Sequence, residues 1–88
     1  MQNINPNPVE TEFFDVTFSS MSGDYKVHVD PNSTIESVTR EIAHNEAFDS
    51  TPVNVYYSGR PLFIKRSFKE NQVANNSKID MTYVIYGG

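Results

Sequence analysis

Apolar and polar side chains alternate in four separate stretches of this chain of 88 residues, at 14–18, 25–30, 53–57 and 79–86. Successive side chains of a β-strand point to opposite faces of a sheet, so a period of two indicates a strand with one buried face. The alternation predicts four half-buried strands. Any fold of this chain must therefore cover one face of each strand with apolar side chains from elsewhere.

One stretch between the second and third strands has a helical spacing instead. Ile35, Val38 and Ile42 stand at i, i+3 and i+7, which places them on one face of a helix. The residues that we expect on its outward face are Glu36, Thr39, Arg40, Glu41 and His44. The sequence therefore predicts one amphipathic helix that covers part of the sheet.

The ends of this helix carry recognisable signals. Ser33 with Glu36 fits a capping box, and Thr34 is an equally good N-cap residue. The helix should end near residues 45–46, and Phe48 is placed to fold back onto the core.

Turn residues separate the strands. The polar run 19–24 predicts a β-hairpin whose loop is longer than two residues or contains a bulge, with Gly23 free to take a positive φ. Residues 58–61 predict a second turn, followed by a short edge strand at 62–64. Residues 65–78 have no clear period, and we interpret Phe68 and Val73 as isolated core anchors beneath a polar loop.

The order of elements indicates an α+β fold. A hairpin, one helix and further strands suggest a mixed sheet of four to five strands packed on one α-helix. The first and last strands are predicted to be parallel neighbours in its centre, and Ile79, Met81, Tyr83 and Ile85 to form the inward face of the last strand. Residues 1–12 are rich in Asn, Pro and Glu and predict a disordered leader before a domain at 13–88.

Composition excludes several classes of function. The net charge of −4 argues against a basic face for nucleic acid, and no apolar run reaches membrane-spanning length. No cysteine is present, so the chain has no disulfide and no thiolate, which fits a reducing compartment such as the cytoplasm or the nucleus. We found no phosphate-binding loop, nucleophile or metal-ligand spacing, so the sequence predicts neither an enzyme nor a cofactor.

The last strand is followed by Gly87 and Gly88. Glycine has no Cβ, so two of them form a slim extended tail that can enter a narrow enzyme channel. The alternative reading is an ordinary frayed terminus.

The order of elements, the length and the diglycine together resemble ubiquitin and its β-grasp fold. Residues 29–31, followed by Thr34-Ile35-Glu36-Ser37-Val38 and Ile42, resemble the passage from strand to helix in that family. Tyr57-Ser58-Gly59-Arg60, followed by Leu62, resembles its third strand and the turn after it. The resemblance covers residues 14–88.

The resemblance implies a protein modifier. Gly88 would supply the acyl carbon that is adenylated with ATP, carried as a thioester on enzyme cysteines and joined to a target amine, and Gly87 would keep the approach slim. The implied partners are activating and conjugating enzymes, a processing protease or self-processing neighbour domain, and target proteins. Neither nucleic acid nor a membrane is implied, and we expect a monomer.

The resemblance also assigns a partner-binding surface on the outer face of the sheet. The matching positions are Met21, Tyr56 and Thr82, with Asp80 adding negative charge. Arg60 replaces a lysine that ubiquitin uses to build chains. Val84 stands where the ubiquitin-activating enzyme reads an arginine, which favours a different activating enzyme or none.

Two other functions remain open. One is a non-covalent ubiquitin-like interaction domain that belongs to a larger or polyprotein precursor. The other is a sulfur carrier, in which Gly88 becomes a thiocarboxylate.

Overall fold

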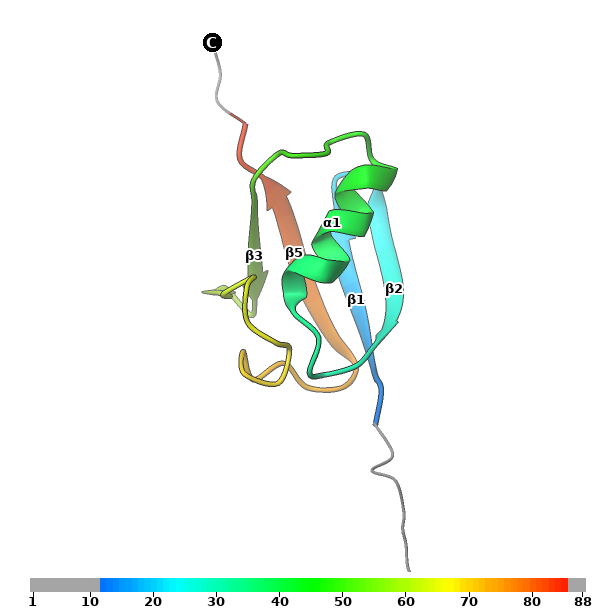
Figure 1. Cartoon of the computed structure of the whole chain (residues 1–88), viewed down its shortest axis with the longest axis vertical. Coiled ribbons are helices and arrows are strands. Elements are labelled where there is room, and N and C mark those ends of the chain that lie inside the picture. The colour runs from blue at the N-terminus through cyan, green and yellow to red at the C-terminus, as the bar shows by residue number, and fades with distance from the viewer. Residues whose placement is uncertain (1–11, 86–88) are drawn as a thin grey trace, which may run out of the picture.

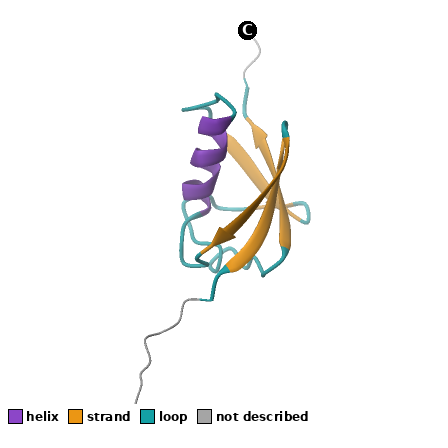
Figure 2. Cartoon of the chain, turned by 90° about the vertical axis from the view of Figure 1, so that its right-hand side faces the viewer, coloured by secondary structure: helices purple, strands orange, loops and turns teal. Residues whose placement is uncertain are grey.

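The computed structural model describes residues 12–85, and within them five strands form one mixed sheet that packs on a single helix (Figures 1 and 2). The elements are β1 (Phe14–Ser20), β2 (Gly23–Val29), α1 (Ile35–Asn45), β3 (Val53–Tyr57), β4 (Arg60–Pro61) and β5 (Ser77–Tyr83). The strands lie in the order β2-β1-β5-β3-β4. The α+β class, with a mixed sheet of five strands on one α-helix, is as the sequence predicted.

The first and last strands form the centre of the sheet. They run parallel, with Phe18 opposite Ile79, whereas every other pairing is antiparallel. Both of these side chains are fully buried. The predicted parallel pairing is confirmed, and the whole segment from β2 to β4 is the crossover that joins the two strands.

The core lies between the sheet and α1. Ile35 and Ile42 of the helix face Val16, Val55 and Met81 of the sheet within one buried cluster. The loop after β4 adds two buried side chains to the cluster, Phe68 and Val73. The ring of Phe68 is edge-on to that of Phe18, with the ring centroids 6.2 Å apart. The two predicted loop anchors are therefore confirmed as core residues.

Both hairpins close through two residues. Ser20 pairs with Gly23, so Met21 and Ser22 form the first loop, and the longer loop or bulge that we expected is wrong. Short polar side chains such as Ser20 remain in the ladder because they face solvent or a polar partner while their backbone pairs. Gly23 has the expected positive φ, of 123°.

The second hairpin turns at Ser58 and Gly59, whose φ values of 52° and 76° suit the mirror-image turns that match the twist of a hairpin. The edge strand is therefore β4, at Arg60–Pro61, and the edge strand expected at 62–64 is wrong. Leu62 donates one more backbone bond to Val55 at 2.9 Å, and Ile64 then accepts from the amide of Glu36. The chain leaves the sheet at this point, and its carbonyl groups then accept hydrogen bonds from free amides in the first turn of the helix.

The helix begins after Thr34, whose side chain accepts a hydrogen bond from the Ser37 amide at 3.2 Å. Thr34 is thus the N-cap of the two candidates, and the helix ends at Asn45, as expected. Thr39 was predicted to face outward, and this prediction is wrong, because Thr39 is only 2% exposed. It tolerates burial because its hydroxyl donates to the carbonyl oxygen of Glu36 at 3.2 Å.

Candidate functional site

The face of the sheet that points away from α1 carries most of the predicted partner-binding residues. Asp80 and Thr82 are exposed positions of β5, on either side of the buried Met81. Asp80 lies opposite Ser19 of β1 and opposite Tyr56 of β3. Directly opposed residues of neighbouring strands share a face, so the half-buried Tyr56 flanks Asp80 on this surface.

A shallow depression of about 490 Å³ connects this face to the first hairpin turn. The side chains that line it belong to Ser19, Ser20, Met21, Asp80, Met81, Thr82, Tyr83 and Ile85. Met21 and Ile85 are 67% and 65% exposed. We use the name outer patch for the five residues Met21, Tyr56, Asp80, Thr82 and Ile85.

Ile85 corrects one expectation and adds a residue that the sequence analysis missed. The alternation placed it on the inward face of β5, but β5 ends at Tyr83. The amide of Val84 still donates to the carbonyl of Pro52 at 2.8 Å, after which the described chain has no further strand pairing. Released from the sheet, the Ile85 side chain joins the outer patch.

Two predicted partner-binding residues lie elsewhere. Arg60 pairs with Tyr57, and its guanidinium lies 5.8 Å from the centre of that ring and donates to the carbonyl of Asn71 at 3.0 Å. Tyr57 contacts the core, so Arg60 is directed to the side of the sheet opposite the outer patch. Val84 is half-buried next to Pro52.

A hydrogen-bonded cluster holds the end of β5 from the inner side. The carboxylate of Glu46, just after α1, accepts hydrogen bonds from the hydroxyls of Ser20 at 2.8 Å, Tyr25 at 2.9 Å and Tyr83. The ring of Phe48 stacks on Tyr83 with centroids 4.4 Å apart. These contacts join the helix end, the first hairpin and the last strand at one end of the molecule (Figure 1).

The cluster changes the acidity of two of its members. Burial raises the pKa of Glu46, but hydrogen bonds from Tyr83, Ser20, Tyr25 and Ser22 outweigh it and leave the pKa below 4.5. Burial first, and then the hydrogen bond to the Glu46 carboxylate and its negative charge, together raise the pKa of Tyr83 to about 12. No local spacing rule relates these residues, so no pattern in the sequence predicts the cluster.

Other chemical features are sparse among residues 12–85. In this range no group of three metal-binding side chains comes together. No helix of the described chain has the length and apolar composition needed to cross a membrane. The predicted conjugation residues Gly87 and Gly88, and residues 1–11 of the predicted leader, lie outside the described residues.

The fold has counterparts among solved structures. No protein-family model and no curated protein matches the chain. Among solved structures it resembles the ubiquitin of Caldiarchaeum subterraneum, with a TM-score of 0.69 and 19% identity over 88% of this chain and 100% of that one. It also resembles an N-terminal ubiquitin-like domain of another protein, with a TM-score of 0.73 and 9% identity over 100% and 92% of the two chains.

A protein designed on the basis of ubiquitin is a further match, with a TM-score of 0.70 and 18% identity over 85% of this chain and 93% of that one. At these identities the likeness concerns the fold. The chain therefore has the ubiquitin-like β-grasp fold that the sequence predicted.

Proposed function

We propose that this chain is a ubiquitin-like protein modifier, joined to target amines through the carboxyl group of Gly88. The observation that supports the proposal is the way in which the described chain leaves the sheet. β5 ends at Tyr83, Val84 makes a last backbone bond to Pro52, and Ile85 is exposed before the diglycine. In a ubiquitin-like fold, such an exit offers the following residues to an enzyme.

The proposed chemistry belongs to partner enzymes. The Gly88 carboxylate attacks the α-phosphate of ATP and releases pyrophosphate, which gives an acyl adenylate. An enzyme thiolate then displaces AMP to form a thioester, and a target amine displaces the thiol to form an amide. The chain contributes the acyl group, and its glycines contribute the narrow approach.

The outer patch is the surface that we propose for the recognising enzymes. Met21 and Ile85 offer adaptable apolar area beside the point at which the tail leaves, and Tyr56 adds an aromatic ring with a polar end. Asp80 makes the patch acidic. A partner with a basic residue next to an apolar pocket fits this arrangement.

Incubation with candidate activating enzymes and ATP tests the proposal. We expect an adduct on a non-reducing gel that a thiol reagent removes, and intact-mass analysis that places the bond on Gly88. The matched control is Gly88→Ala, which leaves residues 12–85 unchanged. If no enzyme forms the adduct, and no lysine in the native cells carries a remnant of this tail, covalent use is excluded.

A non-covalent interaction domain is the second candidate, and Val84 is the observation that favours it. An activating enzyme that selects a positive charge at this position finds an apolar, half-buried side chain instead. One of the similar structures is itself an N-terminal ubiquitin-like domain of another protein. Partner binding that survives Gly88→Ala and fails after Met21→Ala would favour this candidate. An oxygen-to-sulfur mass increase on the intact chain would instead indicate a sulfur carrier.

A further inference from the structure

One edge of β3 is open over part of its length. β4 pairs with β3 at Tyr56 and Tyr57, and Leu62 adds one bond to Val55. Along an antiparallel strand, the backbone groups of successive residues point alternately to one neighbouring strand and to the other. The carbonyl of Pro52 accepts a hydrogen bond from the Val84 amide, so the backbone of Pro52 points to the β5 side. The N–H and C=O of Val53 therefore point away from β5, and among residues 12–85 neither group has a hydrogen-bond partner.

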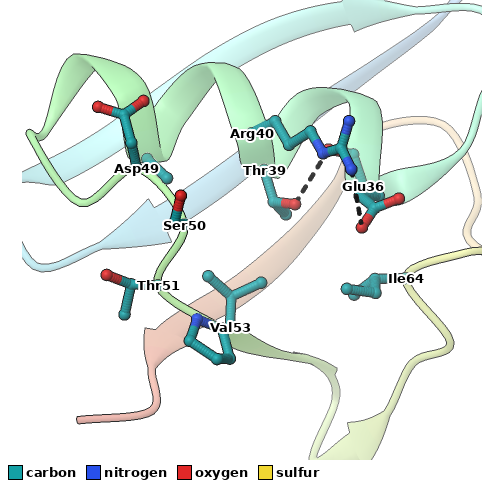
Figure 3. A pocket seen from close by; sticks show the side chains of 10 residues that line it. Glu36, Thr39, Arg40, Asp49, Ser50, Thr51, Val53 and Ile64 are labelled. Carbon is teal, nitrogen blue, oxygen red and sulfur yellow. Dashed lines mark hydrogen bonds and ion pairs between the residues drawn. The ribbon is translucent and has the colours of Figure 1, made fainter.

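A groove runs between this open edge and α1 (Figure 3). Its volume is about 440 Å³, within the range of peptide- and ligand-sized sites. The residues that line it are Glu36, Thr39, Arg40 and Ala43 of the helix, Asp49, Ser50, Thr51 and Pro52 of the connector, Val53 of β3, and Ile64. The groove thus has a helical wall on one side, a strand edge on the other, and the apolar side chain of Ile64 as part of its lining.

Short side chains keep the groove open. Thr39 and Ala43, both buried, form part of its wall, and the Thr39 hydroxyl bonds to the helix backbone at Glu36. Val53 is partly buried against the core, so its side chain does not cover its own backbone edge. The helical wall from Glu36 to Ala43 is about 10 Å long, which matches about three residues of an extended strand.

The two ends of the groove differ in charge. At one end the Glu36 carboxylate is shared by Arg40 at 3.7 Å and Lys65 at 3.9 Å, so two cations face one anion. At the other end Asp49 pairs with the imidazole of His44 at 2.8 Å. An acidic group of a ligand is therefore favoured beside Arg40 and Lys65.

We propose that this groove binds an extended peptide that adds to the edge of β3 as a further strand. Its backbone pairs with the N–H and C=O of Val53, its apolar side chains contact Ala43, Val53 and Ile64, and an acidic side chain lies beside Arg40 and Lys65. Strand addition draws affinity from backbone hydrogen bonds and specificity from alternate side chains. The site is separate from the outer patch, which lies on the other face of the sheet.

The first experiment titrates a labelled peptide, Asp-Asp-Val-Thr-Ile-Thr-Val, into the full chain and follows backbone amide signals by NMR. We expect the shifts to centre on Val53, Ala43 and Ile64, with slower hydrogen exchange at the Val53 amide. The matched control peptide has the same sequence with N-methylated backbone amides at alternate positions. It should lose binding, because it cannot donate to a strand edge.

Two variants separate charge from backbone pairing. Arg40→Glu should weaken binding of the acidic peptide about fivefold, since each exposed charge contact contributes modestly. The same variant should improve binding of a second peptide, Lys-Lys-Val-Thr-Ile-Thr-Val, in which two lysines replace the aspartates. Lys26→Glu, an equally exposed change on β2, should alter neither. Val53→Pro removes the edge donor and should abolish binding, with circular dichroism to confirm folding.

Three results would overturn the proposal. Chemical-shift changes confined to Met21 and Thr82 would show that the peptide binds to the outer patch and not to the groove. Equal binding of the N-methylated peptide would exclude strand addition as the mode of binding. Shifts at Val53 that grow with protein concentration, before any peptide is added, would identify a second copy of this chain as the occupant.

Discussion

The two sides of β5 near its end differ in their contacts. On the inner side, Tyr83 is held by the Glu46 carboxylate and stacked on Phe48. On the outer side, Thr82 and Ile85 are exposed. The end of β5 is therefore held by contacts on its inner side, and its outer side is exposed to solvent.

Alternation along one strand produces this division. Ile79 and Met81 are buried between the sheet and the helix, while Asp80 and Thr82 face solvent. The inner residues therefore contribute most of the stability of this strand, and the outer residues contribute little to it.

The largest difference in stability between the two sides of β5 is expected from a pair of alanine substitutions. Ile79→Ala removes a fully buried side chain between β1 and β3, and we expect it to lower the free energy of unfolding by about 3–4 kcal/mol. Thr82→Ala, three residues further on, should change it by no more than about 0.5 kcal/mol. Urea denaturation measures both, and a similar cost at the two positions would refute the division.

A smaller effect is expected from the polar cluster. Glu46→Ala leaves three hydroxyls without their common acceptor, and we expect a loss of about 2 kcal/mol because all of them lie in partly buried positions. Glu41→Ala, an exposed change of the same kind on α1, is the matched control and should cost less than about 0.5 kcal/mol. Equal losses in the two variants would mean that the cluster does not hold the end of β5.

The pH dependence of stability tests the contribution of the same polar cluster. The folded pKa of Tyr83 is about 12, above the ordinary 10.0, so its contribution is complete below pH 10 and is lost as the pH rises from 10 toward 12. The folded pKa of Glu46 is below 4.5, so its contribution is present above pH 4.5 and is lost as the pH falls through the lowered value.

We therefore expect a plateau of stability with an alkaline decline of at most about 2 kcal/mol, reduced from the full shift because the groups are partly solvated. Tyr83→Phe should remove the part of this decline that is due to Tyr83. Glu46→Gln should shrink it, because the carboxylate helps to raise the pKa of Tyr83. Denaturation curves between pH 8 and about 12 provide the measurement, and a decline that is unchanged in Tyr83→Phe would assign it to other groups.

Sequence periodicity predicted the elements that depend on burial. The alternation of β1 and β5 and the spacing of Ile35 and Ile42 reflect the cover of one face, so the sheet, the helix and the parallel centre followed from them. The edge strand did not, because β4 is held by a two-residue turn at Ser58 and Gly59 and not by an apolar face.

The candidate site was predictable to a lesser extent. Met21, Tyr56 and Thr82 came from the resemblance, and the structure places them on or beside one surface with Asp80. The Glu46 cluster depends on contacts across 21 to 37 residues of sequence, which no local pattern reports. Arg60 also came from the resemblance, and its pairing with Tyr57 places it on the other side of the sheet.

Ile85 provides the smallest and most discriminating effect. It continues the apolar alternation of Ile79, Met81 and Tyr83, so the pattern alone predicts a buried residue and a large cost on truncation. The structure ends β5 two residues earlier and leaves Ile85 65% exposed. We therefore expect Ile85→Ala to change the free energy of unfolding by less than about 0.5 kcal/mol, against a clear loss for Tyr83→Ala. A cost for Ile85→Ala close to that of Tyr83→Ala would extend β5 to the tail, remove Ile85 from the outer patch and weaken the case for a chain end that is presented to an enzyme.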